Sequence, residues 1–132
     1  MVEMIFAEAL AEEALARRLN LPWSKRMQDW ALEVSDASRL DEFISIMQAE
    51  QLSKSECIAL MELILASADD AESEGHLKPS SWAQVKSELL AQPEIFSGHV
   101  EHWAMLDENA EDVFQITAHM REVWAEMRKQ DS

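Results

Sequence analysis

The chain contains very few residues that break or bend helices. Its 132 residues include only two glycines and three prolines, and there is no tyrosine. Two glycines nearly exclude a glycine-rich phosphate-binding loop, which needs glycines where the backbone approaches the phosphates. Runs of β-branched residues are also missing, whereas Ala, Leu, Met and Glu are abundant. Since these side chains lose little freedom in a helix, the composition predicts an all-α fold.

Cysteine and long apolar runs are equally scarce. Cys57 is the single cysteine, so the chain forms no internal disulfide and needs no oxidising compartment. The first residues lack the basic segment of a secretory signal. The longest apolar stretch, from Cys57 to Ala68, is interrupted by Glu62 and Ser67 and is too short to span a bilayer. We therefore expect a cytoplasmic protein with no membrane contact.

Basic residues are outnumbered by acidic ones. The chain has 26 acids against 11 bases, a formal net charge of −15. A negative field of this kind repels nucleic acid and anionic membranes and attracts basic proteins. The same charge also serves solubility alone, and the composition leaves both interpretations open. If the charge is functional, the expected partner is a basic protein, without direct contact to nucleic acid.

Apolar residues recur at helical spacing along nearly the whole chain. The pattern predicts seven helices, over residues 3–19, 23–34, 37–50, 54–72, 81–91, 94–106 and 110–129. No linker is long enough to divide the chain, and short loops favour antiparallel neighbours. The expected fold is one acidic all-α domain over residues 1–132, a bundle of about six to seven mostly antiparallel helices.

The segment 54–72 is the expected central helix of this bundle. Ser53 and Glu56 have the spacing of a capping box, which satisfies two free amides at a helix start. The segment is apolar nearly all round, which is typical of a helix buried among others. Gly75 is expected to end it, because glycine readily takes the left-handed conformation found after helices.

Two acidic clusters stand near predicted helix ends. One closes the central helix and the other opens the last helix. Acids at a helix start suit the helix dipole, whereas acids in a last turn oppose it. A tryptophan beside acids can anchor a basic partner. The residues predicted to bind the partner are Asp69, Asp70, Glu72, Glu74, Asp107, Glu108, Glu111, Asp112 and Trp103.

Catalytic motifs are not found in the sequence. It has no paired-cysteine motif, HExxH helix or nucleophile elbow, so we expect no enzyme and no cofactor. His99 and His102 are three residues apart, and such a pair can begin a metal site on one helix face. A stable site needs further ligands from another helix, for which His119, Glu122 and the acids at 107–112 are candidates. A metal-dependent enzyme using His99 and His102 is therefore the least favoured hypothesis.

The favoured hypothesis is a small acidic helical binding protein. It would cap a basic surface on a toxin or a nucleic-acid-binding protein, as immunity-type and nucleic-acid-mimic inhibitors do. Electrostatic steering would bring the partners together, and association would weaken with salt. The alternative is a helical homo-oligomer, for example a homodimer, with a structural or regulatory role and no inhibitor function.

Overall fold

The fold is described by a computed structural model. It describes residues 2–27, 29–49, 51–108 and 113–130, with side chains from residue 9 onward. Over these ranges the chain is helical and contains no strand, which confirms the expected all-α bundle. The helices are α1 (Val2–Leu19), α2 (Trp30–Val34), the short 3-10 helix η1 (Ala37–Arg39), α3 (Leu40–Ala49), α4 (Lys54–Ser73), α5 (Pro79–Ala91), α6 (Pro93–Ala104) and α7 (Thr117–Gln130). None of the described helices has the length and apolar character needed to cross a membrane.

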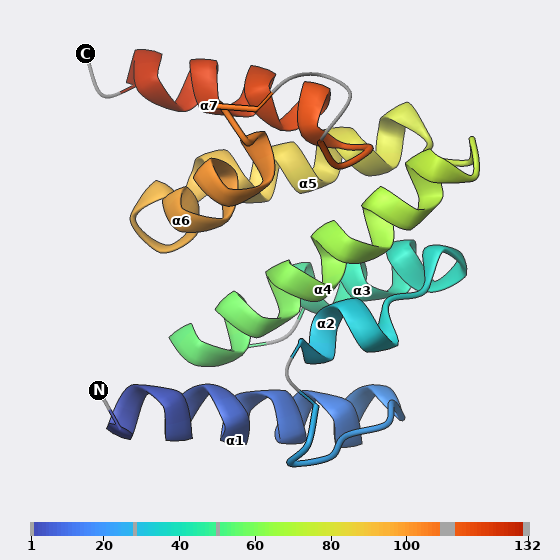
Figure 1. The fold of residues 1–132 in the computed structure, drawn as a ribbon, viewed down its shortest axis with the longest axis vertical. Coiled ribbons are helices and arrows are strands. Elements are labelled where there is room, and N and C mark those ends of the chain that lie inside the picture. Colours follow the sequence, from blue (N-terminus) through green and yellow to red (C-terminus); the bar gives the residue numbers. More distant parts are fainter. Residues whose placement is uncertain (1, 28, 50, 109–112, 131–132) are drawn as a thin grey trace.

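The central helix of the bundle is α4, as its sequence predicts. It runs obliquely through the molecule, with α1, α2 and α3 on one side and α5, α6 and α7 on the other (Figure 1). The Ser53–Glu56 capping box is present, and Gly75 follows the helix with a φ of 75°. Buried apolar side chains from all seven α-helices form one core cluster around α4. Burial of this kind stabilises helices that are individually marginal in water.

The prediction of a helix over residues 23–34 is largely wrong. Only Trp30–Val34 is helical, because side chains engage the backbone before it. The indole N–H of Trp30 donates to the carbonyl of Pro22 at 2.8 Å, and the hydroxyl of Ser24 accepts from the amide of Arg26 at 3.2 Å. Such local bonds compete with the regular helical ladder. Residues 20–27 therefore form an irregular segment over the end of α1.

The helix predicted over residues 110–129 begins later than expected. Residues 110–112 lie outside the described ranges, and α7 starts at Thr117. The amide of Ile116 donates to the carboxylate of Asp69 on α4, so this amide is engaged by another helix. At the preceding turn, α6 ends at Ala104, and Met105 takes a left-handed φ of 44°. A tertiary hydrogen bond thus lies just before α7, and a left-handed residue follows α6.

Candidate functional site

The acidic cluster at the end of α4 is held mainly by intramolecular contacts. The hydroxyl of Ser35 donates to Oδ2 of Asp70 at 2.6 Å. Oε2 of Glu72 lies 2.5 Å from Nε2 of His119 on α7. Each contact joins α4 to a segment far away in sequence. These partners explain why acids occupy a helix end whose dipole disfavours them.

Asp69 belongs to the same cluster and holds the segment that precedes α7. Its Oδ1 accepts a hydrogen bond from the amide of Ile116 at 3.0 Å. Partial burial raises the pKa of Asp69 above its ordinary value; the Ile116 and Gln115 amides oppose this shift, and the charges of Asp70 and Glu72 add to it. Asp69 is thus a positioning residue for the α6–α7 connection, and little of its carboxylate is left for a partner.

Two substitutions of Asp69 separate its hydrogen bond from its charge. Asp69→Ala is expected to lower the free energy of unfolding by about 1–2 kcal/mol, because the Ile116 amide loses its acceptor. Asp69→Asn keeps a carbonyl oxygen for that amide and removes the partly buried charge. We expect it to change the free energy of unfolding by less than about 1 kcal/mol in urea denaturation.

The raised pKa of Asp69 also predicts how the stability difference between the wild type and Asp69→Asn depends on pH. The carboxylate is disfavoured more in the folded state than in the unfolded state, where the pKa is near 3.8. Stability is therefore lost as the pH rises from about that value through the folded-state pKa. The free energy of unfolding of the wild type relative to Asp69→Asn should fall over this acidic window. A difference that grows with pH would contradict the assignment.

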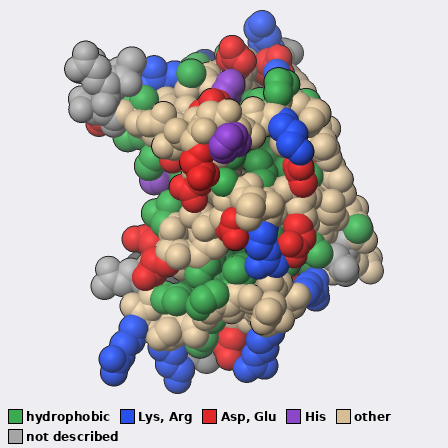
Figure 2. Space-filling view, turned by 90° about the vertical axis from the view of Figure 1, so that its right-hand side faces the viewer, with side chains coloured by type: hydrophobic (Ala, Val, Ile, Leu, Met, Phe, Trp, Pro, Cys, Tyr) green, Lys and Arg blue, Asp and Glu red, His purple; other side chains and the backbone are tan. Residues whose placement is uncertain are grey.

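A hollow of about 760 Å³ lies beside the C-terminal end of α4. We call it the acidic hollow; its lining residues are Ser35, Asp36, Ala37, Ser38, Asp70, Ser73, Glu74 and His76. Three of these are carboxylates, and no Lys or Arg is among the described residues of the lining. In Figure 2, acidic side chains on this face of the molecule lie beside a histidine and among several basic side chains, and further basic side chains line the lower edge. Since the last carbonyls of α4 add partial negative charge, the acidic hollow is suited to a cationic group.

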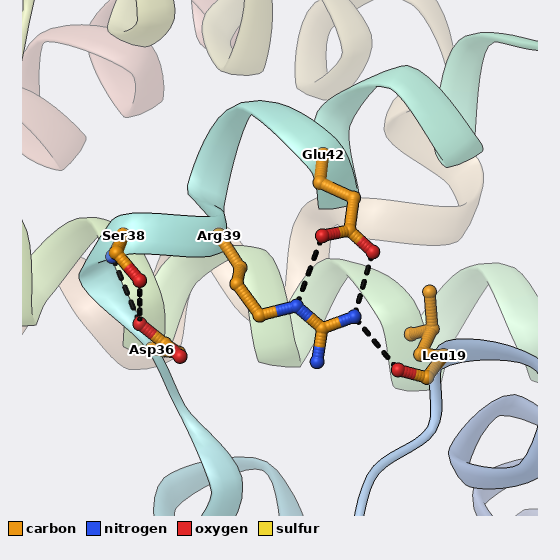
Figure 3. A network of polar contacts seen from close by, with 5 residues as sticks. All are labelled: Leu19, Asp36, Ser38, Arg39 and Glu42. Atoms are coloured by element: carbon orange, nitrogen blue, oxygen red, sulfur yellow. Dashed lines mark hydrogen bonds and ion pairs between the residues drawn. The ribbon is translucent and has the colours of Figure 1, made fainter.

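Arg39 follows the lining residues in the chain, but its guanidinium is engaged elsewhere. Nε and Nη2 donate to the two carboxylate oxygens of Glu42 at 2.9 and 2.6 Å, and Nη2 also donates to the carbonyl of Leu19 at 2.7 Å (Figure 3). Asp36 instead accepts hydrogen bonds from the amide and hydroxyl of Ser38, at 2.9 and 2.6 Å. The carboxylate of Asp36 is therefore hydrogen-bonded to Ser38 rather than to the Arg39 guanidinium.

The second predicted acidic cluster lies in a different part of the surface. Asp107 and Glu108 are exposed in the turn after α6 and line a separate hollow of about 510 Å³. They do not open a helix, as the sequence suggested, because α7 begins at Thr117. Glu111 and Asp112 lie outside the described residues. Thus Asp70 and Glu74 line one hollow, and Asp107 and Glu108 line another, so the two clusters do not form one continuous site.

Trp103, predicted as an aromatic anchor, is a core residue. Its exposed fraction is 1%, and its ring centroid lies 4.3 Å from that of Phe114. The indole N–H donates to Oε1 of Glu62 at 3.2 Å, and the hydroxyl of Thr117 donates to the Trp103 carbonyl at 2.8 Å. Its indole therefore has almost no surface to offer a partner in this structure.

His99 and His102 occupy different environments. His99 is buried, and its Nε2 lies 3.0 Å from the carbonyl of Ile58 and 3.6 Å from Oε2 of Glu62. Because a carbonyl only accepts, Nε2 of His99 carries a proton and donates to Ile58. His102 is exposed and packs edge-on against Trp103. Within the described ranges, no three His, Cys, Asp or Glu residues are grouped so that they could hold a metal ion.

Cys57 lies half-buried near the start of α4 as a free thiol. Burial raises its pKa, and the charges of Glu56 and Glu88 raise it further. A thiol with a raised pKa stays protonated at neutral pH and is a poor nucleophile. The environment of Cys57 therefore gives no support to thiol chemistry.

Comparison with known proteins identifies no relative: no family model matches the chain, and neither a curated protein nor a solved structure shows significant similarity to it. We therefore infer the function from the geometry of this chain.

Proposed function

We propose that this chain is an acidic helical binding protein that caps a basic surface on a partner protein in the cytoplasm. The partner would be a toxin or a nucleic-acid-binding protein, and capping would inhibit it. The observation that carries this proposal is the acidic hollow, where Asp36, Asp70 and Glu74 surround one depression without a Lys or Arg in the described lining. An arginine or lysine side chain of the partner would enter there.

The electrostatics of the chain support this mode of binding. A net charge of −15 attracts a basic protein over several ångströms and raises the association rate. Charged groups lining an open hollow add specificity more than affinity, because they remain partly solvated. Asp70 is oriented by the hydroxyl of Ser35, so one acceptor is already in place before binding.

The proposal is tested by pull-down from a native lysate with wild type and a double variant, Asp70→Asn with Glu74→Gln. Captured proteins are identified and their amounts compared at about 50 and 500 mM salt, since exposed charges are strongly screened at the higher concentration. We expect basic proteins on the wild type, about tenfold less on the double variant, and loss of the complex at high salt.

The matched control is Glu33→Gln with Glu122→Gln, which changes the net charge equally at two exposed acids outside the acidic hollow. This control should retain the captured protein. Equal losses in both double variants would show that only net charge matters. A salt-insensitive complex, or none with a basic protein, would overturn the proposal.

A homo-oligomer remains the second candidate, and one apolar surface favours it. A hollow of about 380 Å³ lies between α1 and the segment 23–27, lined in part by Ala9, Leu10, Trp23 and Met27. Leu10 is 52% exposed there. Sedimentation velocity should then show a dimer that Leu10→Gln converts to a monomer. A wild-type monomer at high concentration would exclude this candidate.

A further inference from the structure

Gly98 lies in the middle of α6 without a structural reason in the chain itself. The helix is continuous from Pro93 to Ala104, and Gly98 has no positive φ that would require glycine. A Cβ built at Gly98 would meet no atom within 4 Å, so no neighbouring element needs its absence. Glycine is among the least favourable residues for a helix interior. Gly98 therefore lowers the stability of α6, and no packing contact within the described part of the chain explains why a glycine is present there.

Gly98 lines a groove of about 510 Å³ between α6 on one side and α1 and α2 on the other. Both sides pack on α4, whose N-terminal half lies between α6 and α1 (Figure 1). We call this depression the α6 groove; its lining is Glu12, Asp29, Trp30, Ala31, Leu32, Ile58, Glu62, Ile95, Gly98, His99 and His102. At Gly98 the α6 backbone is uncovered toward the groove, which allows a very close approach.

The α6 groove is both apolar and acidic. Leu32 is 51% exposed at its edge, and Ile58 and Ile95 are half-buried. Asp29 and Glu62 supply carboxylates, and the described lining contains no Lys or Arg. Glu62 is held in place, because it accepts a hydrogen bond from the indole of Trp103. An apolar strip with acids along it complements a helix that has one apolar face bordered by Lys or Arg.

We propose that the α6 groove binds an amphipathic basic helix of a partner protein, with the backbone of that helix crossing α6 at Gly98. Small residues at a helix crossing let two backbones approach closely, and a side chain at Gly98 would hold them apart. Leucines of the bound helix would meet Ile58, Ile95 and Leu32, and its cations would pair with Asp29 and Glu62. This inference does not rest on the acidic hollow, which has a separate lining at the other end of α4.

The test uses a labelled synthetic helix of about 18 residues built from Leu and Lys, with Leu at helical spacing. Its affinity is measured by fluorescence anisotropy at about 150 mM salt, against wild type, Gly98→Gln and Ser97→Gln. Ser97 is exposed beside Gly98 but does not line the groove, so the two variants place the same glutamine inside and outside the groove. We expect Gly98→Gln to weaken binding at least about tenfold and Ser97→Gln to leave it within about twofold.

The stability of the same variants distinguishes a binding defect from a folding defect. Because glutamine favours a helix more than glycine does and the space at Gly98 is open, Gly98→Gln should raise Tm by about 2–4 °C. A variant that is more stable and yet binds less tightly supports the proposal. A lower Tm that accompanies the lost binding would contradict the open space and overturn it.

Three further outcomes would overturn the proposal. A peptide of the same composition without an apolar face could bind equally well, which would reduce the interaction to charge. Asp70→Asn with Glu74→Gln could abolish binding, which would move the site to the acidic hollow. Sedimentation could show a wild-type dimer that Gly98→Gln makes monomeric, which would assign the groove to a second copy of the chain. Failure of the proposed capping function would leave all three measurements unaffected.

Discussion

Replacing Trp103 with alanine is expected to lower the free energy of unfolding by about 3–5 kcal/mol. The indole fills the space between α6 and the Phe114 segment with 1% exposure, so its removal leaves a large cavity. It also removes the donor that Glu62 accepts. A loss of this size is a large fraction of the stability of an ordinary domain, so the unfolding midpoint should move to clearly lower urea. Urea denaturation followed by circular dichroism measures the change without relying on tryptophan fluorescence.

Trp124→Ala is the matched control, because it removes the same side chain from a less buried place. Trp124 is half-buried on α7, under the guanidinium of Arg128 at 4.8 Å. We expect a loss of only about 1–2 kcal/mol for it. Trp103→Phe should fall between the two, since it keeps most of the volume and loses the hydrogen bond to Glu62. Equal losses for Trp103→Ala and Trp124→Ala would contradict the packing described for α6.

Replacing Arg121 with alanine is expected to cost about 2–4 kcal/mol. The guanidinium, on α7, donates to the carbonyls of Ala104, Met105 and Glu108 at 2.8, 2.7 and 3.0 Å. These carbonyls follow the end of α6, where Met105 turns left-handed, and they lose their charged donor in the variant. Hydrogen bonds from a charged donor are stronger than neutral ones, and three of them converge on one side chain. Thermal and urea unfolding should both show the loss.

Two comparisons make the Arg121 prediction specific. Lysine at position 121 carries the same charge but lacks the planar fork, so Arg121→Lys should recover less than half of the lost stability. Arg128→Ala removes an exposed arginine from the same helix and should cost less than about 1 kcal/mol. If Arg121→Lys were as stable as the wild type, charge alone would be sufficient. The hydrogen-bond geometry at the end of α6 would then be irrelevant.

The contacts of Arg121 show why the tertiary structure was only partly predictable. Arg121 looks like any charged residue of an amphipathic helix, and its three acceptors are main-chain carbonyls, which leave no trace in sequence. Asp70 and Glu74 were predicted as partner-binding residues, and the structure brings both to one hollow with Asp36, which the sequence did not single out. The sequence places Asp36 just before a helix, where an acid usually caps the first amides, so it gave no reason to expect a binding role.

Asp69 and Glu72 are also predicted to bind a partner, but in the structure they contact other parts of the same chain. Acids in the last turn of a helix oppose its dipole, and a binding site is one explanation for them. The structure supplies another, because Ile116 and His119 are their partners. Both partners are 47 residues away along the chain, a separation that no local pattern reveals.

The helical class, the central place of α4 and the excess of negative charge can all be predicted from the order of amino acids. Periodicity, propensity and capping act within one or two helical turns, so they can be read from neighbouring residues. The starts of α2 and α7, the exposure of individual acids and the place of Gly98 in a groove are visible only in the folded chain. These features depend on contacts between segments distant in sequence. The neighbouring helix determines which partner a carboxylate has and whether a glycine lies beside a groove.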